Sequence, residues 1–148
     1  MKREETIDYN IKASWHAIYR MYNQQAIKNN ITTSIGFVLL NIDAENGTPA
    51  TKIAPLMGLE ARSLTRMLKS MEEKNLIYKE PDLIDKRSVR IFLTEEGKVK
   101  KEISRKTVKT FNNVIKEVIP AEKLAIFFDV LHEVNRLIEE KNVYAAHK

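Results

Sequence analysis

A cationic stripe between residues 60 and 74 has the clearest potential for chemistry in this sequence. Arg62, Arg66 and Lys69 recur at intervals of three and four residues, and this spacing places them on one face of a helix. A guanidinium group can donate two hydrogen bonds to guanine in the major groove of DNA, which is wide enough to admit one helix. The stripe therefore predicts contact with duplex DNA, although a solvated helix face commonly has the same composition.

Neighbouring side chains on the same helix extend this prediction. Ala61 and Thr65 suit contact with the methyl group of thymine, whereas Ser63 and Lys69 suit phosphate groups. The predicted DNA-binding residues of this helix are Ala61, Arg62, Ser63, Thr65, Arg66 and Lys69.

A second cationic cluster, Lys86 and Arg87, lies in the polar segment 81–88. Segments of strand-like composition, 76–80 and 89–93, flank it, and the second of them alternates apolar and polar residues. This arrangement predicts an antiparallel hairpin with a basic tip, which could enter a minor groove beside the helix. The helix and the hairpin together favour DNA contact more strongly than the stripe alone.

Other groupings of reactive side chains do not support a catalytic or metal site. His132 and Glu133 begin like a zinc-protease motif, but Arg136 occupies the place of the second histidine. His16, His132 and His147 have no cysteine to complete a metal site. The sequence also has no signature of a serine nucleophile and no glycine-rich phosphate loop. We therefore expect no catalytic residue, no metal and no cofactor.

The composition is that of an ordinary globular protein. The chain has 148 residues, of which 43% are hydrophobic and 30% are charged, and this favours one domain spanning 1–148. The absence of cysteine excludes disulfides and thiol-based redox sensing. No apolar run is long enough for a membrane helix, and the N-terminal residues predict no secretory signal, so we expect a cytoplasmic protein without a membrane partner. The net charge of +5 favours an anionic partner.

Apolar spacing and capping residues divide the chain into helices and one strand pair. The predicted helices span about 7–29, 33–45, 49–57, 60–74, 95–118 and 120–142, and the predicted strands span 76–80 and 89–93. The segment Thr32-Thr33-Ser34 is expected to contain the N-cap of the second helix, and Thr94 is the expected N-cap of the fifth. Thr48 is expected to cap the third helix, with Pro49 at its first position. Asn75 suits the left-handed conformation that ends a helix.

The helix at 60–74 has an apolar face opposite its cationic stripe. We expect this face to be buried, and it consists of Leu64, Met67, Leu68 and Met71. The lysines and arginines of the helix at 95–118 are expected to be solvated, and the alternative is that some of them add a positive field near DNA. The first helix and the last two carry apolar stripes that need a second surface to cover them.

The three short helices and the hairpin, from Thr32 to Leu93, have the layout of a winged helix-turn-helix. Three stretches resemble the MarR family of bacterial transcription regulators, and the resemblance covers about residues 7–141. They are the segment 64–77 (LTRMLKSMEEKNLI), the tip Asp85-Lys86-Arg87, and the step Leu93-Thr94-Glu95-Glu96-Gly97.

This resemblance implies a mainly α winged helix-turn-helix protein with long N- and C-terminal dimerisation helices and one β-hairpin wing. It implies a DNA-binding lobe at 32–95 and a helical dimerisation region at 7–29 and 97–142. It further implies a homodimer that binds a pseudo-palindromic operator on double-stranded DNA, usually as a repressor, and that responds to a small aromatic or anionic effector.

The resemblance also assigns the wing to Lys79–Ile91. Its expected DNA-binding residues are Lys79, Asp85, Lys86 and Arg87. Arg87 is the wing arginine, and Asp85 would orient it through an ion pair. Lys79 stands where arginine is common, and Asn75 stands where glycine is common.

Trp15, Tyr19 and Phe37 are candidates for an effector pocket, because the first two helices should border it. The alternative is that these aromatic side chains pack in the core or at the dimer interface. Two other functional classes remain open at this stage. One is a winged-helix module that binds an acidic protein without specific DNA binding, and the other is a small-molecule enzyme with a site assembled from distant residues.

Overall fold

The computed structural model describes residues 1–141 and 143–145, and these form two compact units. Unit 1 spans Met1–Val108, and unit 2 spans Lys109–Lys148. Two residues named above, Asn142 at the predicted end of the last helix and His147 among the histidines, lie outside the described residues.

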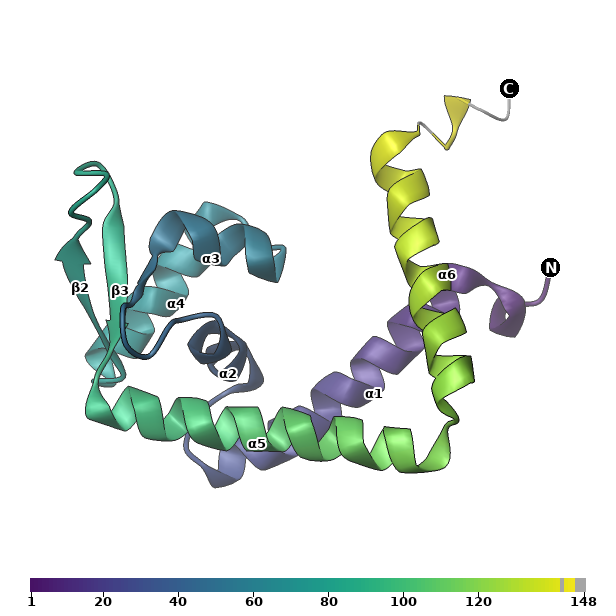
Figure 1. Ribbon diagram of the computed structural model, residues 1–148, viewed down its shortest axis with the longest axis horizontal. Coiled ribbons are helices and arrows are strands. Elements are labelled where there is room, and N and C mark those ends of the chain that lie inside the picture. The colour runs from purple at the N-terminus through teal and green to yellow at the C-terminus, as the bar shows by residue number, and fades with distance from the viewer. Residues whose placement is uncertain (142, 146–148) are drawn as a thin grey trace. The chain divides into compact units, whose positions relative to one another are not determined.

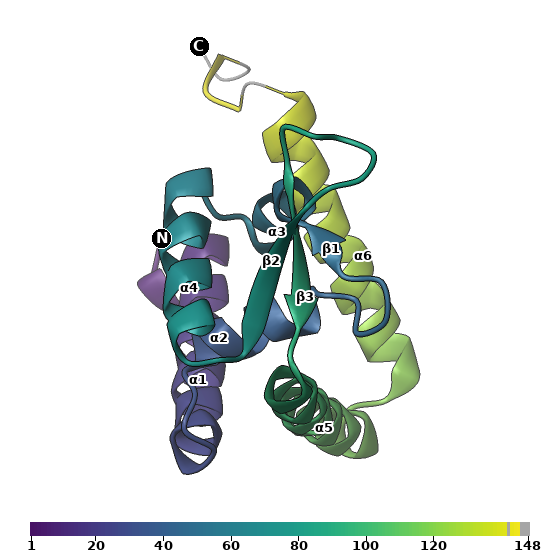
Figure 2. The same cartoon turned by 90° about the vertical axis from the view of Figure 1, so that its left-hand side faces the viewer.

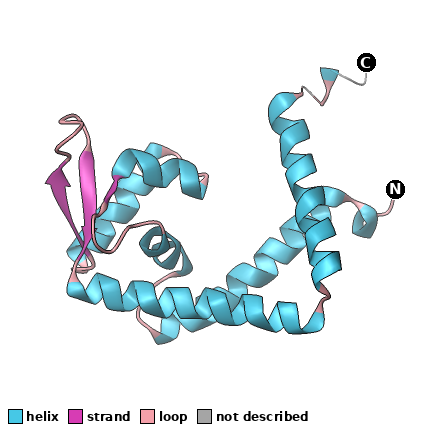
Figure 3. Ribbon diagram, viewed as in Figure 1, coloured by secondary structure: helices cyan, strands magenta, loops and turns pink. Residues whose placement is uncertain are grey.

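Unit 1 contains a short 3-10 helix, four complete α-helices, a small antiparallel sheet and the first part of a fifth α-helix (Figures 1 and 3). In chain order these elements are η1 (Arg3–Glu5), α1 (Ile7–Lys28), α2 (Thr33–Leu40), β1 (Thr48–Pro49), α3 (Ala50–Met57), α4 (Ala61–Glu73), β2 (Ile77–Pro81), β3 (Val89–Leu93) and α5 (Glu95–Val118). Unit 2 contains the end of α5 and then α6 (Ala121–Glu140). The mainly helical winged-helix architecture is confirmed.

Helix α2 begins as predicted and ends earlier than predicted. The Thr32 hydroxyl oxygen accepts a hydrogen bond from the backbone N–H of Ile35 at 3.1 Å, so Thr32 is the N-cap. The helix ends at Leu40 rather than near 45. The carboxylate of Asp43 instead accepts hydrogen bonds from the backbone N–H groups of Asn46 (2.7 Å) and Glu45 (2.9 Å). These two bonds lower the pKa of the Asp43 carboxyl and stabilise a turn that competes with the helix.

A third strand, β1, was not predicted from the sequence. Thr48 and Pro49 pair with Ile91 and Arg90 of β3, so the sheet order is β1-β3-β2. The prediction of one isolated hairpin, with Thr48 capping a helix, is therefore wrong. The Thr48 hydroxyl oxygen accepts a hydrogen bond from the backbone N–H of Asp43 (2.9 Å), and Pro49 is the residue that precedes α3.

The core of unit 1 lies where α2, α3 and α4 pack with the sheet. Its fully buried large side chains are Val38, Leu39, Ile42, Ile53, Met71, Ile77 and Ile91. Leu64 and Leu68 of α4 are also buried, and Met67 packs partly buried against the same cluster. The predicted apolar face of α4 is therefore confirmed.

The step from β3 into α5 is built around Thr94 and Gly97. The Thr94 hydroxyl accepts a hydrogen bond from the Gly97 N–H (3.0 Å) and donates one to the Asn75 carbonyl (2.7 Å). A Cβ atom at Gly97 would lie 2.0 Å from the carbonyl oxygen of Leu76, so no larger residue fits without moving the backbone. Asn75 has the predicted left-handed conformation (φ 59°). The Leu-Thr-x-x-Gly step thus joins the end of α4 to the start of α5.

Two lysines of α5 anchor other helices of unit 1, contrary to the prediction that the cations of this helix are solvated. The Lys100 ammonium donates a hydrogen bond to the carbonyl of Asn29 (2.7 Å), just beyond α1. The Lys101 ammonium donates one to the carbonyl of Ile42, just beyond α2. Both lysines satisfy carbonyl groups that a helix end leaves without a partner.

Helix α6 begins after Pro120, as predicted, and none of its residues is buried. Its most exposed large apolar residues are Ile126, Phe127, Phe128, Val130 and Ile138. None of the described helices combines the length and the apolarity that crossing a bilayer requires.

Candidate nucleic-acid interface

Helix α4 presents its cationic residues on the side that faces away from the core. Leu64 and Leu68 are 3% and 4% exposed and hold the inner face. The outer face displays five exposed side chains, and Ser63 at its margin is half-buried; the five are Ala61, Arg62, Thr65, Arg66 and Lys69. The six predicted residues of this helix are therefore on one accessible strip.

The cations of this strip are not neutralised by neighbours. Within residues 1–141 and 143–145, no carboxylate forms an ion pair with Arg62, Arg66 or Lys69. Thr65 donates its hydroxyl proton to the carbonyl of Ala61 (2.9 Å), so it presents a methyl group and an acceptor oxygen rather than a donor. The strip thus combines free guanidinium donors with a small apolar contact, and this combination can read base edges.

The wing places Lys86 and Arg87 at its exposed tip. Asp85 does not orient Arg87 as the resemblance implied, because its carboxylate accepts a hydrogen bond from the Arg87 backbone N–H (3.0 Å). Among the described residues, Arg87 has no ion pair with Asp85. The short Asx turn competes for the carboxylate and leaves the guanidinium free.

A buried aspartate, which sequence reasoning missed, holds the base of this tip. The Asp82 carboxylate accepts a hydrogen bond from the Ile84 N–H (3.2 Å) and lies 3.7 Å from the Arg90 guanidinium. Arg90 also donates hydrogen bonds to the carbonyls of Asn46 (3.0 Å) and Gly47 (3.2 Å). The sequence signal for this pair is an acidic residue directly after the first strand and a basic residue in the second strand, on either side of the tip.

The first turn of α4 and the tip of the wing lie at the same end of unit 1 (Figures 1 and 2). The fold therefore places the start of α4 and the wing tip at one end of unit 1, although β2 separates them in the sequence. Lys79 differs from the other predicted DNA-binding cations, because its ammonium forms an ion pair with Glu72 (3.8 Å) and is partly covered.

Comparisons with known proteins agree with this geometry. A model of the MarR family matches residues 31–89. The organic hydroperoxide resistance transcriptional regulator of Bacillus subtilis (strain 168) is 33% identical over 102 residues, which is 69% of this chain and 69% of that protein. This chain belongs to the MarR family. The transcriptional regulator SarZ of Staphylococcus aureus (strain USA300) is 28% identical over 96 residues, 64% of this chain and 65% of that protein.

Solved structures of similar fold include a DNA complex and a ligand complex. The MepR–DNA complex of S. aureus has a TM-score of 0.83 at 21% identity and covers 93% of this chain and 99% of that one. CouR of Rhodococcus jostii RHA1, bound to p-coumaroyl-CoA, has a TM-score of 0.76 at 20% identity, with 90% and 94% covered. These structures show the fold. The curated relatives named above are transcriptional regulators, and this MarR-family chain is a transcription regulator.

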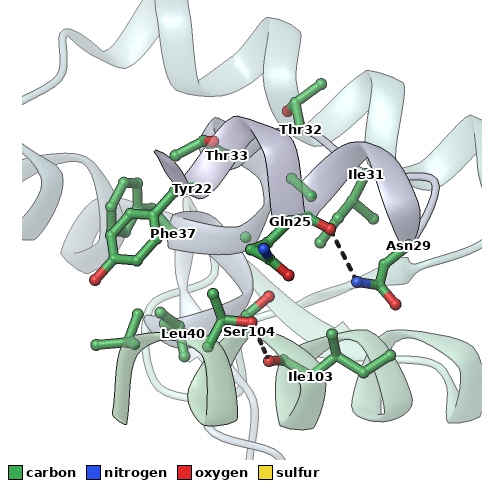
Figure 4. Close-up of a pocket in the computed structure, with 14 residues that line it drawn as sticks. Tyr22, Gln25, Asn29, Ile31, Thr32, Thr33, Phe37, Leu40, Ile103 and Ser104 are labelled. Carbon is green, nitrogen blue, oxygen red and sulfur yellow. Dashed lines mark hydrogen bonds between the residues drawn. The ribbon is translucent and has the colours of Figure 1, made fainter. Parts of the chain in front are cut away.

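A small cavity lies between α1, α2 and α5 of this MarR-family lobe (Figure 4). Its volume is about 40 Å³, and the side chains around it include Tyr22, Gln25, Ala26, Asn29, Ile31, Thr33, Phe37, Leu40, Ser104 and Thr107. Of the three predicted pocket residues, only Phe37 lines it. Trp15 and Tyr19 line a shallow surface groove on α1 instead, together with His16 and Arg20.

The aromatic residues are nevertheless connected to the cavity. The Trp15 ring stacks on Phe37 with 6.0 Å between centroids, and Tyr22 meets Phe37 edge-on at 5.9 Å. Burial raises the pKa of the Tyr22 hydroxyl. Sequence reasoning missed the wall that α5 supplies, because Ser104 and Thr107 are distant in the chain and have no distinctive pattern.

Proposed function

We propose that this MarR-family protein is a homodimeric repressor that binds a pseudo-palindromic operator sequence-specifically. In this proposal α4 enters the major groove, Arg62 and Arg66 bind guanine, and the wing cations contact an adjacent minor groove. The observation that carries the proposal is the outer face of α4, where both guanidinium groups are exposed and unpaired on a helix fixed by its buried inner face. The DNA-bound structures of MepR and of Streptococcus pneumoniae FabT support it. Action on the bacterial chromosome would place the protein in the cytoplasm.

We further propose a division of labour along the chain, with DNA binding at 32–95 and dimerisation at 7–29 and 97–142. The support is the distribution of exposed apolar side chains. Ile7, Ile11 and Trp15 of α1 are 62%, 43% and 48% exposed, and the exposed apolar residues of α6 need cover as well. A two-fold axis through such helices would set the recognition helices about 34 Å apart, one turn of DNA.

An effector of small aromatic or anionic character would bind at the α1–α2–α5 cavity and release the operator. The ligand-bound structures of CouR and of PcaV from Streptomyces coelicolor support this part of the proposal. The cavity has room for only on the order of three water molecules, so a ligand must widen it. The chain has no cysteine, so a thiol cannot serve as a hydroperoxide sensor here.

The test is selection of bound sequences from a random duplex pool, followed by light scattering of the complex. We expect a pseudo-palindrome with half-sites one helical turn apart, bound by two copies of the 17.2 kDa chain. A monomer on an asymmetric site, or weak salt-insensitive binding, would contradict the proposal and favour a protein-binding module.

Arg66→Ala provides the residue-level test. We expect binding to the selected duplex to weaken by about 1–3 kcal/mol, with relaxed preference at one base pair. Arg105→Ala is the matched control, because Arg105 is an exposed arginine on α5 that pairs with Glu102. Equal loss in both variants would show that Arg66 contributes only general positive charge.

A further inference from the structure

The tip of the wing exposes two large aliphatic side chains. Leu83 and Ile84 are 94% and 90% exposed, and apart from Met1 they are the most exposed large apolar residues described in unit 1. Exposure of this extent means that the two side chains contribute almost nothing to folding, because neither loses its contact with water. Two such residues side by side at a projecting tip are typical of a contact surface.

The tip is an ordered turn. The Asp82 carboxylate fixes the backbone of Ile84, and the backbone of Ser88 donates to the Asp85 carbonyl at 3.0 Å and accepts from the Asp82 N–H at 3.0 Å. Arg90 in turn ties Asp82 to the segment before β1. The structure therefore holds the apolar pair in place, and binding need not order it first.

The surroundings of the pair indicate which partner it fits. Lys86 and Arg87 follow directly and are exposed, and no ion pair in the described part of the chain neutralises them. Two side chains cover far less than the roughly 800 Å² that each partner contributes to a stable protein interface. Cations beside a narrow apolar projection instead match a groove bordered by phosphates.

We propose that Leu83 and Ile84 form an apolar wedge that enters the DNA minor groove and partly unstacks one base step. The duplex then bends towards the major groove, while Lys86 and Arg87 bind the bordering phosphates. The inference rests on the proposed DNA binding and adds to it a deformation of the duplex. Flexible pyrimidine–purine steps are the cheapest to unstack, so the wedge selects for them without hydrogen bonds to bases.

The test measures DNA shape as well as affinity. The probe is the selected duplex with 2-aminopurine at the step flanking a half-site and a fluorophore pair at its ends. The wild-type protein should raise the 2-aminopurine fluorescence and shorten the end-to-end distance. The double variant L83S/I84S should lose both signals and bind about tenfold more weakly, while its salt dependence stays the same because no charge is removed.

Two control variants separate the wedge from general effects. Leu56→Ser removes a comparably exposed side chain (68%) from α3, at a position to which neither proposal gives a contact, and should change neither signal. L83M/I84M keeps an apolar tip and should retain both. The double variant K86A/R87A should instead reduce the salt slope by about 4, the expected contribution of two phosphate contacts from each of the two copies.

Each other outcome overturns the inference. An L83S/I84S protein that still bends the duplex and binds with wild-type affinity eliminates the wedge and leaves the proposed function intact. A change in oligomeric state caused by this variant would assign the tip to a second copy of the chain. A wild-type protein that binds no duplex at all would eliminate both the wedge and the proposed function.

Discussion

The two units of this chain differ in how deeply they bury residues that belong to similar apolar patterns. Ile91 in the sheet of unit 1 is fully buried, whereas Ile138 on α6 of unit 2 is 64% exposed. Both belong to stripes that the sequence marks as apolar. Unit 1 closes its core within one copy of the chain, while α6 has no buried residue of its own. A regular apolar stripe therefore indicates that a helix or strand face is to be buried. It does not indicate whether the same chain or a second copy covers that face.

The largest effect should come from the core of unit 1. Ile91→Ala is expected to lower the free energy of unfolding by about 2–5 kcal/mol, because it leaves a cavity in a packed interior. Urea denaturation at two protein concentrations measures this, and the loss should be the same at both.

Ile138→Ala is the matched change in unit 2. Its effect should depend on protein concentration and should disappear at dilutions where the chain is monomeric, because its side chain would be covered only by a partner. A large loss that persists in the monomer would break the contrast between the two units.

A smaller effect should come from the joint between β3 and α5. Gly97→Ala places a methyl group against the Leu76 carbonyl, and we expect a loss of about 3 kcal/mol, the upper end of the range for overpacking. Gly36→Ala is the control, because its Cβ would lie 3.2 Å from the Ser104 hydroxyl oxygen and no closer than 3.8 Å to the other atoms around it. Thermal unfolding of both variants provides the measurement. Equal stability of the two variants would show that the backbone at Gly97 can shift away from the Leu76 carbonyl without loss of stability.

The smallest effect should come from the contacts that Arg90 makes at the base of the wing tip. Arg90→Ala removes the partner of buried Asp82 and should cost about 1 kcal/mol of stability. Arg90→Lys keeps the charge but loses the paired donation to the Asn46 and Gly47 carbonyls. Hydrogen exchange should accelerate in 82–90 and remain unchanged in α4. Faster exchange throughout unit 1 would show that the contacts of Arg90 stabilise the whole core and not the wing alone.

The sequence predicted those features that depend on neighbouring residues. The faces of α4, the Thr32 and Thr94 caps and the Asn75 turn all follow from spacing or side-chain type within one or two turns. The early end of α2 was missed, because the Asp43 carboxylate competes with a helix that composition favours.

Features that depend on distant residues were not predictable in this way. Strand β1 exists because Thr48 and Pro49 meet β3 about forty residues later. The tie from Arg90 to Asn46 and the α5 wall of the cavity have the same cause. On the candidate interface, the sequence identified the cations but not which of them form ion pairs. The Asp85 carboxylate binds the backbone N–H of Arg87 rather than its guanidinium group, whereas the Lys79 ammonium pairs with Glu72.

The stack of Trp15 on Phe37 has a practical consequence. Trp15 is the only tryptophan in the chain, and it lies against a residue that lines the α1–α2–α5 cavity. Its intrinsic emission therefore reports on that contact without any added label. A titration followed in the near ultraviolet can reveal whether a compound displaces the stack, and the same signal can follow the protein as it is mixed with duplex.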